Sequence, residues 1–78
     1  MLHVTDAKYI DNYRIWLSFD DGTDGTVNLE THLKGPIFEP LKDINNFKKV
    51  TFSKELSTIT WPNGADLAPE FLKDIIVS

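Results

Sequence analysis

Over residues 13–19 an apolar side chain recurs at every second position. The apolar side chains that share one face of this segment are Ile15, Leu17 and Phe19. A repeat of two residues is the side-chain period of a β-strand. The alternation returns at Val27 and Leu29, after a turn over residues 20–25 that contains two glycines. These two segments therefore predict a β-hairpin.

The segment before this hairpin also has the content of a strand, over residues 2–10. Its apolar phase slips between Val4 and the pair Ala7 and Tyr9. A slip of one residue moves side chains to the other face of a sheet, so we expect a β-bulge or a bend at this point. We expect a third antiparallel strand here, which ends at a turn over residues 11–12.

The middle of the chain changes from strand period to helix period. Residues 29–33 predict one short turn, which ends at the Gly35-Pro36 pair. Apolar residues then recur at roughly helical spacing: Ile37, Phe38, Leu41, Ile44 and Phe47. Pro40 interrupts this pattern, so we expect a short helix followed by a turn at which Asp43 acts as N-cap.

The second half repeats the strand pattern. Val50 and Phe52 alternate with polar residues, as do Ile59 and Trp61. The sequence therefore predicts a second hairpin that turns over residues 54–56. The apolar residues between 67 and 75 fit a short amphipathic helix.

Together these patterns predict one α+β domain over residues 1–78. It has a small, mostly antiparallel sheet of about five strands, formed by two hairpins and the N-terminal strand, with two short helices. Pro69 suits the first turn of the last helix, and the carboxylate of Asp66 or Glu70 is expected to complement its N-terminus.

The composition excludes several classes of functional site. The chain has 78 residues, a formal net charge of -4 and no cysteine. Without cysteine there is no disulfide, thiolate zinc site or cysteine nucleophile. The N-terminus has no signal-peptide pattern, so we expect a cytoplasmic protein without a membrane segment. The negative charge does not favour nucleic-acid binding on its own. A chain this short gains stability from burying more area, which favours a protein partner or a homodimer.

The strand-end motif Trp61-Pro62-Asn63-Gly64-Ala65-Asp66, with the upstream Leu41-Lys42-Asp43, Phe47 and Phe19-Asp20-Asp21-Gly22, closely resembles the bacterial family DUF2442. The resemblance covers nearly the whole chain and implies a small α+β fold. Some similar proteins look like members of two-gene modules of toxin–antitoxin type. Longer relatives carry a helix-turn-helix after this domain. Residues 1–78 contain no such motif, so we expect protein binding to be the shared role and do not expect DNA binding by these residues alone.

Two places in the sequence are candidates for binding. Alternation points Trp16 away from the core, on the same face as Arg14, and a Trp beside an Arg is typical of an interface hot spot. The alternative is that both faces of the sheet are covered. The other candidate is the loop with Trp61, Asn63 and Asp66, whose residues either bind a ligand or partner or serve as core residue, turn residue and helix cap.

No other motif indicates chemistry. The aspartates around Gly22 do not keep the spacing of an EF-hand, which favours a polar hairpin turn. His3 and His32 have no partner at a known metal-ligand spacing, and Asp6 suits His3 as a surface pair only. No serine lies in a nucleophile motif. We therefore expect no cofactor, no metal and no catalytic residue, and an enzyme that uses the Asn63–Asp66 loop is the alternative to a protein-binding module.

Overall fold

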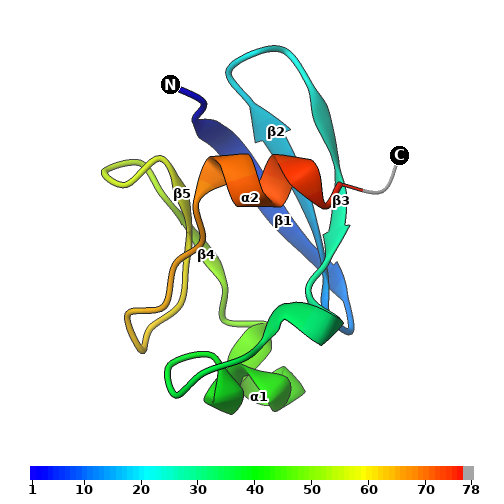
Figure 1. Ribbon diagram of the computed structural model, residues 1–78, viewed down its shortest axis with the longest axis vertical. Coiled ribbons are helices and arrows are strands. Elements are labelled where there is room, and N and C mark those ends of the chain that lie inside the picture. Colours follow the sequence, from blue (N-terminus) through cyan, green and yellow to red (C-terminus); the bar gives the residue numbers. More distant parts are fainter. Residues whose placement is uncertain (77–78) are drawn as a thin grey trace.

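The computed structural model describes residues 1–76, which form an α+β fold of five antiparallel strands and two short α-helices, as predicted (Figure 1). The strands are β1 (Val4–Asp11), β2 (Arg14–Phe19), β3 (Asp24–Asn28), β4 (Thr51–Ser53) and β5 (Thr58–Thr60). The helices are α1 (Ile44–Phe47) and α2 (Pro69–Asp74), with single 3-10 turns η1 (Glu30–His32) and η2 (Glu39–Lys42).

The first three strands form one sheet in the order β1-β2-β3, and α2 crosses one face of it (Figure 1). The predicted alternation is confirmed: Ile15 and Leu17 are completely buried and Phe19 nearly so. The predicted bulge in β1 is also confirmed, because the register with β2 shifts between Val4 and Asp6. A second shift follows between Tyr9 and Asp11. The face under α2, called the inner face below, therefore carries the core.

The segment between the sheets folds as its proline and aspartate predict. Pro40 lies in the first turn of η2, where the missing N–H costs no helical hydrogen bond. Asp43 is the N-cap of α1, and its side chain accepts a hydrogen bond from the backbone N–H of Asn45. Pro40 thus starts η2, and the two short elements stay separate because the backbone of Asp43 between them is extended, with a ψ of 119°.

The second hairpin is confirmed, but it forms a separate two-stranded sheet. β4 and β5 pair from Thr51 opposite Thr60 to Ser53 opposite Thr58. The hairpin is linked to the edge of β1 by a hydrogen bond from Val4 N–H to the carbonyl of Ser57. No ladder of backbone hydrogen bonds joins β1 to this hairpin in residues 1–76, so the five strands divide into sheets of three and two.

An aromatic cluster joins the two sheets around Phe47, which is completely buried. Its ring meets Tyr13 and Tyr9 edge-on, at centroid distances of 5.2 and 6.1 Å, and lies 5.7 Å from the ring of Trp61. The indole Nε1 of Trp61 donates a 2.9 Å hydrogen bond to the carbonyl of Phe47. The cluster thus ties α1 to β1, to the start of β2 and to the end of β5.

Helix α2 closes the inner face. Pro69 is at its first position, as predicted, and Leu72 is completely buried. Beyond the helix, Ile76 packs on Gly25 of β3: a Cβ on Gly25 would lie 2.6 Å from Ile76 Cγ2. Neither helix in residues 1–76 has the length and apolar character needed to cross a membrane.

The two tryptophans allow a matched test of the aromatic cluster. We expect Trp61→Phe to lower the free energy of unfolding by about 2 kcal/mol, because it removes a buried hydrogen bond and leaves a small cavity. Trp16→Phe removes only an exposed hydrogen bond to Asp24 and should cost less than about 1 kcal/mol. Urea unfolding followed by circular dichroism measures both. Equal losses would show that the Trp61 hydrogen bond does not hold the two sheets together.

Candidate functional site

The three-stranded sheet has a second face, opposite α2, that no described element covers. We call it the outer face; its residues are Asp6, Lys8, Arg14, Trp16, Ser18, Asp24, Thr26 and Asn28. Each of them is exposed or half-buried, whereas the alternating residues of β2 on the inner face are buried. Within residues 1–76 the outer face of the sheet is therefore left uncovered.

Trp16 lies at the centre of the outer face. In the register it stands between Lys8 of β1 and Thr26 of β3, and it is half-buried. Its Nε1 donates a 3.0 Å hydrogen bond to Oδ2 of Asp24, which holds the indole over β3. An indole fixed in this way presents a large apolar surface with little side-chain entropy left to lose on binding.

Arg14 shares the outer face with Trp16 but uses a different carboxylate. Its Nε and Nη2 donate to the two oxygens of Asp11 at 2.7 and 2.6 Å. This two-pronged hydrogen bond lowers the pKa of Asp11 and raises the pKa of Arg14. The predicted neighbours are thus on one face, and the charge of Arg14 is already matched within the chain.

The other predicted site residues lie apart from the outer face. Trp61 is a core residue, 3% exposed. Asn63 is a turn residue: its Oδ1 accepts from Ala65 N–H at 3.0 Å and its Nδ2 donates to the carbonyl of Ile37 at 2.8 Å. Gly64 has the positive φ of +89° that the turn needs. The structural interpretation of this motif is confirmed at these positions.

The expected helix-capping role of Asp66 is wrong. The N-cap of α2 is Ala68, and no side chain caps it. Asp66 is exposed and forms an isolated β-bridge with Thr60, because the chain after the turn stays extended until Pro69. Of the two predicted acidic residues, Glu70 alone lies in the first turn of the helix.

An open depression lies beside Asn63. It has a volume of about 170 Å³ and is lined by Pro40, Leu41, Asn46, Lys49, Pro62 and Asn63. The depression is smaller than the roughly 300–1,000 Å³ of a typical small-molecule site. Its two amide side chains are used in holding loops, since Asn46 Nδ2 donates to the carbonyl of Pro40 and Asn63 Nδ2 to that of Ile37.

The sequence profile of a family described as "Protein of unknown function (DUF2442)" matches residues 4–78. The chain belongs to the DUF2442 family. No curated protein and no solved structure matches it.

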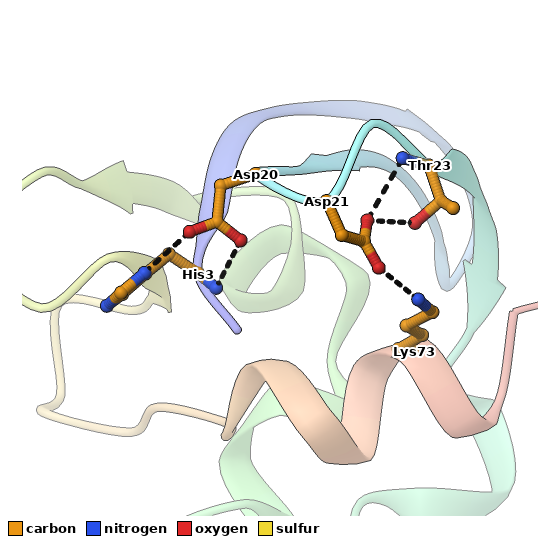
Figure 2. Close-up of polar contacts among 5 residues, drawn as sticks. All are labelled: His3, Asp20, Asp21, Thr23 and Lys73. Carbon is orange, nitrogen blue, oxygen red and sulfur yellow. Dashed lines mark hydrogen bonds and ion pairs between the residues drawn. The ribbon is translucent and has the colours of Figure 1, made fainter. Parts of the chain in front are cut away.

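Sequence reasoning missed two long-range polar contacts of this DUF2442 chain, both at the turn between β2 and β3. Figure 2 shows that neighbouring aspartates of the turn reach to different parts of the molecule. Oδ1 of Asp20 accepts from the backbone N–H of His3 at 3.0 Å, and its Oδ2 lies 2.7 Å from His3 Nδ1. The partner of His3 is therefore Asp20 and not Asp6, which the sequence suggests. Asp21 binds Lys73 of α2. The two pairs are separated by 17 and by 52 positions along the chain, and no local sequence pattern indicates pairing over such distances.

These contacts shift the pKa values of the turn. Hydrogen bonds from His3 lower the pKa of Asp20, and those from Lys73 and Thr23 lower the pKa of Asp21 strongly. Asp21 thereby links the β2–β3 turn to α2 across the open end of the inner face (Figure 2). Within residues 1–76 no three His, Asp or Glu side chains gather as a metal site would require.

The DUF2442 domain should lose stability in acid through these carboxylates. A carboxylate with a lowered pKa in the folded state stabilises fully above its unfolded pKa of about 3.9, and the contribution is lost as pH falls through the folded value. We expect the Tm to fall below about pH 4, and Asp21→Asn to reduce this fall. Glu55→Gln, in the exposed β4–β5 turn, is the control. Identical acid profiles for the wild type and Asp21→Asn would contradict the role of the Asp21–Lys73 pair.

Proposed function

We propose that this DUF2442 domain is a protein-interaction module and that the outer face is its binding surface. The observation that carries the proposal is a half-buried tryptophan, Trp16, at the centre of a sheet face that no described element covers. Tryptophan is among the residues most enriched at the energetic centres of interfaces. A core function alone would have placed Trp16 under a covering element, as happens to Trp61.

The surroundings of Trp16 support the same conclusion. Ile10, at the second bulge of β1, exposes 43% of its surface. Lys8, Asp24 and Arg14 surround the indole with charged groups. An apolar centre with a polar rim is the usual composition of a non-obligate protein interface.

The partner that we propose is a second small cytoplasmic protein encoded beside this one, as in a two-gene module of toxin–antitoxin type. The resemblance of similar sequences to such modules supports this choice. The negative net charge supports a protein partner over a nucleic acid, because polyphosphate would be repelled.

A second candidate function is the binding of a small ligand, or catalysis, at the loop from Asn63 to Asp66. The depression beside Asn63 supports it. Its small volume and its committed amide groups make it the weaker candidate, and Asp66 is not among its lining residues.

The interaction proposal predicts that binding depends on Trp16. Trp16→Thr keeps a good strand-forming residue and removes the indole, and Leu56→Thr is the matched control because Leu56 is 55% exposed in the β4–β5 turn. After co-expression with the neighbouring gene product, we expect calorimetry to show at least about a tenfold weaker Kd for Trp16→Thr. The control should bind like the wild type.

Two outcomes would contradict this proposal. If Trp16→Thr and Leu56→Thr bind the partner equally well, the outer face is not the binding surface. If the neighbouring product and host lysate yield no complex while a metabolite raises the Tm, the ligand-binding candidate is favoured, because a ligand at 100 times its Kd adds about 2.7 kcal/mol of stability.

A further inference from the structure

Strand β3 leaves one row of backbone groups open. It is at the edge of the sheet and pairs with β2 in an unbroken register from Asn28 opposite Arg14 to Asp24 opposite Ser18. One backbone hydrogen bond lies at each end of this pairing: Leu29 N–H donates to the carbonyl of Tyr13, and Phe19 N–H donates to the carbonyl of Thr23. These two bonds identify the pairs 13/29 and 19/23 as hydrogen-bonded pairs of the ladder.

Hydrogen-bonded and non-bonded pairs alternate along an antiparallel ladder. With the two end pairs fixed, the residues of β3 whose N–H and C=O groups point away from β2 are Asp24, Thr26 and Asn28. No backbone group within residues 1–76 bonds to these groups. The open row therefore coincides with the three β3 positions whose side chains lie on the outer face.

Proteins usually protect such edges with bulges, prolines or charged side chains, above all lysines, or cover them. The other edge of the sheet follows this rule, because β1 has two bulges and bonds through Val4 to the β4–β5 hairpin. β3 has no bulge in its register with β2, no proline and no lysine. On its inner side Ile76 packs on Gly25, which leaves the outer side of this edge open in residues 1–76.

The charge along this edge has one sign. The sequence contains four carboxylates and no Lys or Arg between Ile15 and Leu33. Asp20 and Asp21 are paired with His3 and Lys73. Asp24, the first residue of β3, and Glu30, two residues after its end, form no ion pair within residues 1–76. The donor on Asp24 is a neutral indole.

We propose that β3 accepts an extended, basic segment of the partner protein as a fourth strand. This inference rests on the proposed function and adds the chemistry of the partner. Backbone hydrogen bonds to Asp24, Thr26 and Asn28 supply affinity, and Lys or Arg side chains that meet the carboxylates at the two ends of the strand, Asp24 and Glu30, supply specificity. A second copy of this chain fits less well, because two paired β3 strands would bring the unmatched carboxylates of both copies to one seam.

The probe is a capped peptide of about nine residues that alternates lysine and valine, with an alternating glutamate–valine peptide as the control. Amide exchange and chemical shifts in ¹⁵N-labelled protein report the contact. We expect slower exchange at Asp24, Thr26 and Asn28, no change at the amides of β5, and weaker binding at high salt. A basic peptide with N-methyl groups along one edge should not bind, because it lacks the donors.

A matched pair of protein variants tests the same backbone hydrogen bonds by changing β3 instead of the peptide. Thr26→Pro removes an N–H that points away from β2, so the ladder with β2 is retained, whereas Thr26→Val keeps the N–H and the strand propensity. We expect Thr26→Pro to weaken peptide binding up to about tenfold, the value of one hydrogen bond, and Thr26→Val to bind normally. The N-methylated peptide decides the question if Thr26→Pro does not fold.

Three results would overturn the inference. No binding of the basic peptide at millimolar concentration means that the edge does not accept a strand. Equal binding of the N-methylated peptide, with shifts centred on Trp16, means that the outer face binds without the edge, which leaves the proposed function intact. Protection of β3 that rises with protein concentration alone identifies a second copy as the occupant. Failure of the proposed function is seen separately, as partner binding that ignores Trp16→Thr.

Discussion

The hydrogen bond from Trp61 to the carbonyl of Phe47, inside a cluster of four aromatic rings, is the contact on which the rest of the structure depends. A 78-residue chain has little interior to share among its elements. Two short strands such as β4 and β5 are not stable alone. They persist here because the residue after β5 reaches back to the end of α1, and α1 in turn packs on β1 and the start of β2.

This arrangement places the large apolar side chains on one side of the main sheet. The core consists of residues from the inner face, from the segment between β3 and α1, from α1 and α2, and from the second hairpin with the residues that follow it. Nothing comparable remains in residues 1–76 to cover the outer face, so it stays solvated with Trp16 at its centre. The binding surface that we propose is thus a consequence of how a small domain distributes its apolar residues, and its one large indole is an exception to that distribution.

Sequence predicted those parts of the fold that depend on neighbours along the chain. Alternation located β2 and β3, the phase slip at Val4 located the bulge, and Asp43 was found as a cap because its partner is two residues away. It failed where distant segments decide. Asp66 resembles a cap in sequence, but the helix starts later, and the pairing of Asp21 with Lys73 depends on where α2 crosses the sheet.

The candidate site divides in the same way. Alternation alone placed Trp16 and Arg14 on one face, but it could not show that Asp24 and Asp11 hold them. Nor could it show that β3 is an edge, because the order of strands is a tertiary property. The strand order determines what the carboxylates after Ile15 can do. On a central strand these carboxylates would serve solubility alone, whereas at an open edge they bias which strand can join it.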